Sequence, residues 1–252
     1  MQDTRWGMET KDYQQRTYRS LVTDDKLESF RVVVKETDLL VRAQRPLERE
    51  TRDLVLKHRV PLERYADDHP DFVESLTPLS NDHLAPPIVR TMIEASQKAG
   101  VGPMAAVAGA VAEYVGRDLL SYSKEVMIEN GGDIFIRTTF PLTVAIFAGP
   151  SPLSGKMGVR IDSPETPMAV CTSSGSVGHS LSFGSSDAVV VISESAALAD
   201  ATATAIGNSV SKKEDVTSAI RLAGNIQGVL GVVVILDDQM GVWGTVELVG
   251  LG

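Results

Sequence analysis

Residues 199–205 read Ala-Asp-Ala-Thr-Ala-Thr-Ala, a run of small residues that contains one carboxylate and two hydroxyls. The surrounding sequence predicts a helix from Ala196 to Val210, on which Asp200 and Thr204, four positions apart, share one face. A carboxylate oxygen and a hydroxyl on one face can both ligate a hard cation such as Mg²⁺, and the alanines leave room for a phosphate. Alternatively, Asp200 only interacts favourably with the dipole at the helix N-terminus. The motif alone leaves both interpretations open.

A second small-residue segment lies upstream, where six of the eight residues 105–112 are Ala or Gly. The preceding Gly102 and Pro103 favour a helix start, because proline suits the first helical position. Small side chains allow another backbone or a ligand to approach closely. Tight packing of the helix against a sheet explains the same composition without any ligand.

Residues 130–133 read Asn-Gly-Gly-Asp, between two predicted strands. Two consecutive glycines can adopt backbone conformations that are closed to other residues, so their N–H groups can face an anion or a ring edge. The same residues form a common hairpin turn, which is the simpler interpretation. The candidate ligand contacts in this turn are Asn130, Gly131, Gly132 and Asp133.

A loop rich in hydroxyls follows the predicted strand 168–172, and ten of the fifteen residues 172–186 are Ser or Gly. Such a loop can cradle a phosphate, although it lacks the Gly-Lys-Ser/Thr sequence of a P-loop. A flexible linker is the alternative, and Val177, Leu181 and Phe183 argue against it. His179 can donate a hydrogen bond to a ligand or to a carbonyl. The candidate ligand contacts here are Thr172, Ser173, Ser174, Gly175 and His179.

The rest of the chain predicts an α+β fold with two closely packed lobes and a site where the lobes meet. Residues 30–35 and 39–42 indicate a hairpin. A helix from Pro46 is expected to break or kink at Pro61, with a second helix from there to about Leu76, and Gly100 is expected to cap a helix over residues 86–99. We expect a single domain, 1–252, with a hairpin-and-helix part at about 15–100 and a ligand-site part at about 101–252. Further strands are expected at 125–128, 133–137, 142–147, 158–161, 168–172, 188–192, 229–236 and 245–249, with helices at 196–210 and 216–227.

Composition excludes several classes of function. The 252 residues carry a net charge of −9 with a pI near 5.0, which argues against nucleic-acid binding and against an electrostatic membrane anchor. No apolar run is long enough to span a bilayer, and the N-terminus does not resemble a signal peptide, so we expect a cytoplasmic protein. The single cysteine, Cys171, cannot form an internal disulfide.

Five segments resemble, in order and spacing, the ApbE family of FAD:protein FMN transferases, over about residues 105–208. The family has an Ala/Gly-rich helix, a Gly-Gly-Asp turn, a Thr-Ser-Gly segment after a strand, a His-containing loop and an Ala-Asp-Ala-x-Ala-Thr-Ala helix. The resemblance implies an ApbE-like fold with mixed or antiparallel sheets flanked by helices. The matching stretches are 106–110, 129–133, 171–175, 178–180 and 199–205.

By this resemblance, Mg²⁺ would be held by Asp200, Thr204 and the main-chain carbonyl of Ala108. Asp200 and His179 would be catalytic. A flavin nucleotide, FAD or FMN, would lie against residues 130–133, 172–175 and His179. The family uses the metal to cleave the FAD pyrophosphate and passes FMN to a protein threonine, so the partners would be a nucleotide and a protein acceptor.

The chain also shows features of a short branch of the superfamily from archaea and anaerobic bacteria. It has Gly109 and Ala110 where the family carries a Lys-Gly pair, and the stretch between Gly175 and His179 is short. The second hypothesis is therefore a non-catalytic binding or accessory protein, in the sulfur assimilation into homocysteine that the branch is associated with. Cys171 would then be a reactive thiol, or simply a buried strand residue.

Overall fold

The computed structural model describes residues 27–162, 166–175 and 184–251. Its helices are α1 (Glu48–Asp68), α2 (Pro70–Glu74), α3 (Pro87–Ala99), α4 (Val107–Leu119), α5 (Ala196–Asn208) and α6 (Val216–Gly224), with short 3₁₀ turns η2 (Pro103–Ala106) and η3 (Lys213–Asp215). Its strands are β1 (Glu28–Val34), β2 (Thr37–Ala43), β3 (Val126–Asn130), β4 (Asp133–Arg137), β5 (Leu142–Ala145), β6 (Met157–Ile161), β7 (Met168–Ser173), β8 (Ala188–Ser193), β9 (Val229–Leu236), β10 (Gln239–Gly244) and β11 (Glu247–Gly250).

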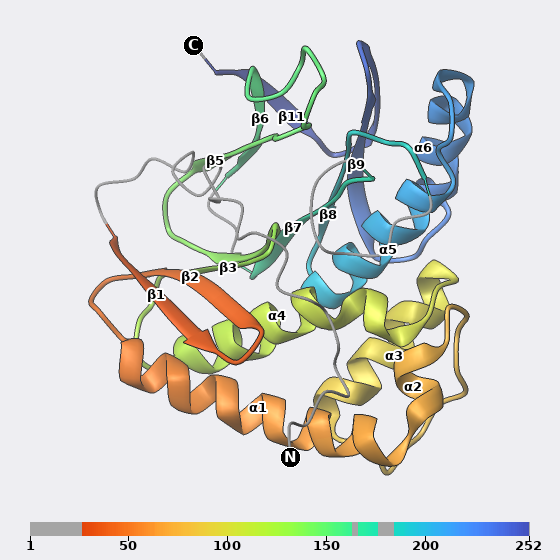
Figure 1. The fold of residues 1–252 in the computed structure, drawn as a ribbon. Coiled ribbons are helices and arrows are strands. Elements are labelled where there is room, and N and C mark those ends of the chain that lie inside the picture. The colour runs from red at the N-terminus through yellow and green to blue at the C-terminus, as the bar shows by residue number, and fades with distance from the viewer. Residues whose placement is uncertain (1–26, 163–165, 176–183, 252) are drawn as a thin grey trace.

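Two antiparallel sheets organise these residues (Figure 1). The larger has eight strands in the order β1-β2-β3-β4-β7-β8-β9-β10, and the smaller has three in the order β11-β6-β5. Every neighbouring pair is antiparallel. The α+β prediction is therefore confirmed, with antiparallel pairing throughout the described strands.

The central strands of the large sheet are buried on both faces, which is why they are so apolar. In β8 all six residues are buried. Because successive side chains point to opposite faces, Val189 and Val191 belong to the core that contains the helices. Val190 and Ile192 belong to a second core, against the three-stranded sheet. The molecule is thus layered as helices, large sheet and small sheet, and α4 and α5 lie against the large sheet.

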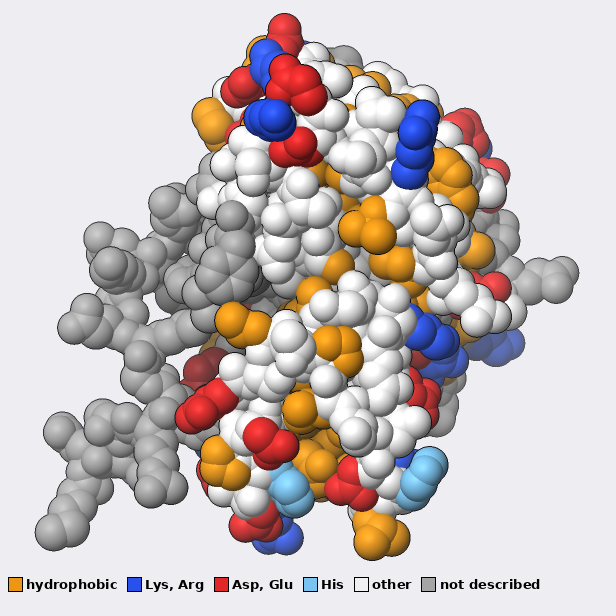
Figure 2. All heavy atoms as spheres, turned by 90° about the vertical axis from the view of Figure 1, so that its right-hand side faces the viewer, with side chains coloured by type: hydrophobic (Ala, Val, Ile, Leu, Met, Phe, Trp, Pro, Cys, Tyr) orange, Lys and Arg blue, Asp and Glu red, His pale blue; other side chains and the backbone are white. Residues whose placement is uncertain are grey.

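The negative net charge does not form one acidic surface on the face seen in Figure 2. Side chains of both signs gather toward the ends and one margin of that face, with uncharged groups and scattered hydrophobic side chains between them.

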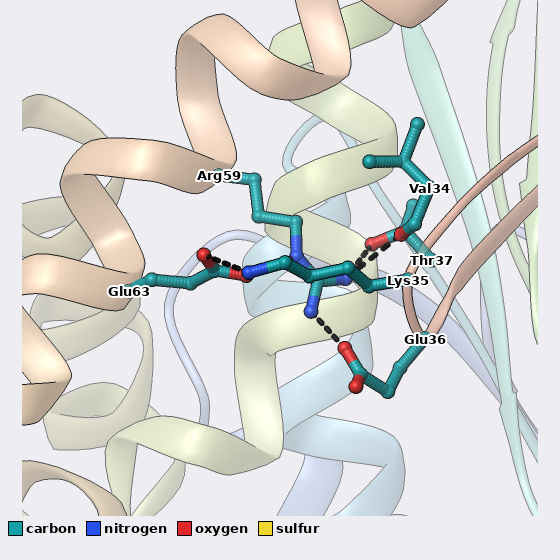
Figure 3. A network of polar contacts seen from close by, with 6 residues as sticks. All are labelled: Val34, Lys35, Glu36, Thr37, Arg59 and Glu63. Carbon is teal, nitrogen blue, oxygen red and sulfur yellow. Dashed lines mark hydrogen bonds and ion pairs between the residues drawn. The ribbon is translucent and has the colours of Figure 1, made fainter. Parts of the chain in front are cut away.

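A polar network fastens the N-terminal hairpin to α1 (Figure 3). The Arg59 guanidinium donates to the Val34 carbonyl at 3.2 Å and to the Thr37 hydroxyl at 2.7 Å, and it pairs with Glu36 and Glu63. Only 14% of the Arg59 side chain is exposed, whereas the Glu36 side chain is 70% exposed, so the bonds to Val34 and Thr37 are better shielded from water than the pair with Glu36. The hairpin and the helical layer therefore form one packed unit.

Several helix boundaries differ from the prediction. α1 does not break at Pro61 but continues to Asp68, and the short α2 follows after His69. The helix also begins at Glu48 rather than at Pro46. The two predicted helices at the C-terminal end are shorter, since α5 stops at Asn208 and α6 stops at Gly224.

Strand β10 was not predicted at all. It pairs with β9 in register from Gln239↔Leu236 to Gly244↔Gly231. Two glycines interrupt its sequence, and its residues are exposed or half-buried at this edge of the sheet, so it lacks the apolar alternation of a typical strand.

Within the described residues, no helix combines the length and apolar character that a membrane crossing requires.

Candidate functional site

The site is built on the contact between α4 and α5, where two small-residue segments meet. Gly109 lies so close to α5 that an added Cβ would be 2.2 Å from the Ala196 carbonyl oxygen and 2.8 Å from the Asp200 Cβ. No side chain can occupy that space without moving a helix. Close packing thus explains the small residues on these two helices, and it brings backbone and carboxylate groups from distant parts of the chain together.

The two helices cap each other. The Asp200 carboxylate on α5 accepts a hydrogen bond from the Gly109 N–H in the first turn of α4, at 2.8 Å. The Glu113 carboxylate on α4 accepts one from the Ala196 N–H at the start of α5, at 2.7 Å, and another from the Ser195 hydroxyl at 3.0 Å. Each carboxylate satisfies main-chain N–H groups that have no partner within their own helix. The predicted alternative for Asp200, a helix-terminal interaction, is therefore present, but with the neighbouring helix.

Asp200 titrates at an unusual pH for an aspartate. Burial raises its pKa to about 7, against the opposing effect of the main-chain hydrogen bonds from Gly109 and Ala108. A carboxyl with this pKa is only partly ionised near neutral pH. A cation beside it would favour the ionised form.

Two ionisable groups of the large sheet interact with Asp200 of α5. Asp133 is paired with Cys171 across β4 and β7, and both residues are buried. Burial, and then the Asp200 charge, hold the pKa of Asp133 well above its usual range. Burial, and then the charges of Asp133 and Asp200, raise the pKa of Cys171 in the same way. Cys171 is therefore a protonated, buried strand residue. Asp133 and Asp200 lie close enough that a charge on Asp200 disfavours ionisation of Asp133.

Three further predicted site residues, Asn130, Ala108 and Thr204, lie near the α4–α5 contact. The Asn130 amide at the end of β3 donates to the Ala108 carbonyl at 3.0 Å, and Ala108 is adjacent to Gly109, the partner of Asp200. Thr204 is half-buried and lies one turn further along α5 on the face of Asp200.

These donors fit a hard cation by their chemistry. A carboxylate, a hydroxyl and a main-chain carbonyl are all oxygen ligands, which Mg²⁺ prefers. No cluster of three His, Cys, Asp or Glu side chains in the described part of the chain could hold a metal. A cation here would therefore depend on Asp200, Thr204, the Ala108 carbonyl and further oxygens from water or a phosphate.

The Gly-Gly turn is a hairpin turn, and it lies next to the end of β7. Gly131 and Gly132 have φ values of +70° and +114°, which glycine adopts without strain. The Gly132 N–H donates to the Glu129 carboxylate at 3.1 Å, so this N–H is already used. A Cβ on Gly132 would lie 3.4 Å from the Thr172 carbonyl oxygen. The predicted turn and the start of the predicted Ser/Gly loop are thus side by side.

Only the two ends of the Ser/Gly loop, residues 172–175 and 184–186, are described. Thr172 and Ser174 are half-buried, and the buried Ser173 hydroxyl has no hydrogen-bond partner among the described residues. The Gly175 N–H donates to the Ser186 carbonyl at 2.9 Å. His179, predicted to contact ligand and to be catalytic, lies outside the described residues.

Sequence reasoning missed Glu113, Glu129 and the steric role of Gly109. A charged residue inside an Ala/Gly-rich helix is a signal that something must compensate it, and Glu113 met that criterion. Its partner could not be named from sequence, because the start of α5 is far away along the chain.

The family model described as AbpE bacteria matches residues 19–238. A UPF0280 protein of Methanocaldococcus jannaschii is 39% identical over 226 residues, which cover 87% of this chain and 92% of that protein. A UPF0280 protein of Methanococcus vannielii is 39% identical over 222 residues, which cover 86% and 90%.

Two solved structures are similar to the fold. The apo form of the Pseudomonas stutzeri flavinyl transferase ApbE matches with a TM-score of 0.56 at 16% identity, covering 86% of this chain and 94% of that one. The ApbE protein of Thermotoga maritima matches with a TM-score of 0.54 at 14% identity, covering 85% and 96%.

Proposed function

The chain belongs to the AbpE bacteria family and has the ApbE flavin-transferase fold, and from that premise we propose that it binds a flavin nucleotide together with Mg²⁺ at the α4–α5 contact. The observation that carries the proposal is that Asp200 and Asn130 bond the two ends of one peptide unit of α4, the Gly109 N–H and the Ala108 carbonyl. Packing alone requires the two helices to touch, but it does not require a half-buried carboxylate whose pKa is raised to about 7 at the point of contact.

In this proposal Asp200, Thr204 and the Ala108 carbonyl hold the cation, and the Asn130 amide fixes the direction of that carbonyl. The nucleotide lies along the β3–β4 turn and residues 172–175. Bound Mg²⁺ would neutralise charge on the phosphate oxygens. In the transferase reaction an acceptor hydroxyl oxygen bonds to the FMN phosphorus, the pyrophosphate bond breaks, AMP leaves, and the hydroxyl proton passes to water.

One observation favours the second candidate, a binding or accessory protein without turnover. Asp200 and the Ala108 carbonyl each already have a protein partner, the Gly109 N–H and the Asn130 amide. A protein that had lost the reaction would keep these contacts for stability. Release of AMP from FAD, followed by chromatography, distinguishes the transferase from the binding protein.

The test is calorimetric titration with FAD, with and without Mg²⁺, for the native protein and Asp200→Asn. The asparagine oxygen can still accept from Gly109, so the helix cap is retained while the charge is removed. We expect Mg²⁺ to strengthen native FAD binding by about tenfold, equivalent to about 1.4 kcal/mol, and to have no effect on the variant.

Asp118→Asn is the matched control. Asp118 is a partly buried aspartate nine residues beyond Gly109 on α4, and its carboxylate pairs with Lys57 and His58 of α1 at 2.7 Å each. This variant should keep the full Mg²⁺ effect. Equal Mg²⁺ effects in the native protein and in Asp200→Asn would refute the assigned cation site.

A further inference from the structure

Glu113 is the least expected charged residue near the site. It sits in the middle of α4 with only 6% of its surface exposed. One carboxylate oxygen receives the Ala196 N–H and the Ser195 hydroxyl from the start of α5, and the other pairs with Arg117 at 2.9 Å. One carboxylate oxygen is therefore bonded to α5 and the other to Arg117 of α4.

The contacts of Glu113 and Asp200 are related by position. On α4, Gly109 and Glu113 are four residues apart, and on α5, Ala196 and Asp200 are four residues apart. Gly109 bonds Asp200, and Glu113 bonds Ala196, so the two segments run in opposite directions where they touch. Two bonds separated by one helical turn fix the axial offset of α5 against α4, which a single bond cannot do.

That offset decides the distance between the Asp200 carboxylate and the Ala108 carbonyl, because the two groups are on different helices. The close approach of Ala196 and Asp200 to the backbone of Gly109 sets how near the helices lie, and the two hydrogen bonds define their offset along the helix axes. Ser195 caps its own helix, accepting from the Leu198 N–H at 3.3 Å, and its hydroxyl also donates to Glu113 on α4 at 3.0 Å.

We propose that Glu113 is a positioning residue for the cation site, keeping Asp200 in place beside the Ala108 carbonyl through its bond to the start of α5. The expected effect on cation affinity rests on the proposed function. Its geometric part, the placement of Asp200 against Gly109, can be measured separately.

The experiment compares Glu113→Ala and Glu113→Gln with Ser195→Ala in the full chain. The first readout is solvent exchange of the Gly109 amide by NMR, since this proton is bonded to Asp200 and not to Glu113. The alanine variant should exchange at least about tenfold faster at Gly109, because the hydrogen bond that protects the amide is lost. The glutamine variant retains an acceptor for Ala196 and should stay close to the native rate.

The second readout is the Mg²⁺ dependence of FAD binding. Glu113→Ala should weaken the apparent Mg²⁺ affinity by about tenfold or more, the usual effect of losing a partner that orients a metal ligand. In an Asp200→Asn background the same change should have no further effect, because Glu113 acts through Asp200. Ser195→Ala removes one hydrogen bond to Glu113 but leaves the one from the Ala196 N–H, so both readouts should change less than in Glu113→Ala.

The outcomes separate the two ideas. If the native protein shows no Mg²⁺ effect, the proposed function fails, and Gly109 exchange still decides whether Glu113 positions Asp200. Native exchange at Gly109 in a folded Glu113→Ala variant would overturn the inference. If that variant does not fold, Glu113→Asp decides instead, because its carboxylate is one methylene shorter and is withdrawn from the Ala196 N–H. Native exchange at Gly109 in Glu113→Asp would overturn the inference.

Discussion

Asp200 caps a neighbouring helix and is also the candidate ligand of a cation. The hydrogen bond from Gly109 favours its ionised form, and burial opposes ionisation more strongly. The residue is therefore poorly satisfied as a carboxylate in the absence of a cation. Its type and spacing to Thr204 were readable from sequence, whereas its pKa depends on α4 and β4, which only the fold brings near.

This balance makes stability depend on pH at a single residue. An unfolded aspartate has a pKa near 3.8, and folded Asp200 has a pKa of about 7. Between these values the folded state keeps a proton that the unfolded state has lost, so the free energy of unfolding falls as the pH rises. Without Mg²⁺, we expect Asp200→Asn to lack this decrease and to exceed native stability at about pH 8, by at least ~1 kcal/mol.

Urea unfolding at several pH values measures this effect. The buried Asp133 should contribute a decrease of the same sign in both proteins, so the variant has a shallower slope and not a flat one. Added Mg²⁺ should stabilise the native protein at the higher pH and leave the variant unchanged. Identical slopes in the two proteins would show that Asp200 is an ordinary surface-like aspartate.

Among the elements, α4 and α5 depend on small residues for their contact. The composition of residues 105–112 and 199–205 correctly indicated close approach, but it did not reveal what approaches. The structure shows that each helix approaches the other and that both lie on the large sheet. Ligand contact and close packing were posed as alternatives, yet close packing is what assembles the candidate site.

Gly109→Ala tests this contact directly. In an unobstructed helix the change would stabilise by about 1 kcal/mol, because alanine has the higher helix propensity. Here the new Cβ would meet the Ala196 carbonyl, which is backbone and cannot rotate away. We expect a net loss of about 1–3 kcal/mol from overpacking, measured by chemical denaturation. A stabilised variant would mean that the helices are further apart than described.

Element boundaries were predictable where local chemistry decides them. The bounds of β4 and β9 agree with the sequence-based expectation, and Gly100 caps α3 in the left-handed conformation. Pro61 was misjudged because the cost of a proline in a helix is offset when the flanking turns pack against the core, as Leu62 and Ala66 do. β10 was missed because its pairing with β9, and not its own sequence, makes it a strand.

At the scale of the whole molecule, the sheet continues across the two parts that the sequence suggested. β2, from the hairpin-and-helix part, pairs with β3, from the ligand-site part, over the register Leu39↔Asn130 to Ala43↔Val126. Helix α4 also contacts α1, and both contribute to one hydrophobic core. The sequence could separate the parts by composition, but the strand order that joins them is a long-range property.

This continuity predicts that the chain folds as one unit, so a fragment of residues 101–252 should not fold alone. Removing residues 1–100 would leave β3 without β2 and expose the α4 surface that packs against α1 and α3. An unpaired apolar strand at a sheet edge favours aggregation, and the lost burial cannot be replaced within the fragment.

The intact chain should unfold in one calorimetric transition, with equal van't Hoff and calorimetric enthalpies. The fragment should give a poorly dispersed amide NMR spectrum, and adding a separate 1–100 chain should restore dispersion. A dispersed spectrum for 101–252 alone, or two transitions in the intact chain, would show that the two parts are separate domains.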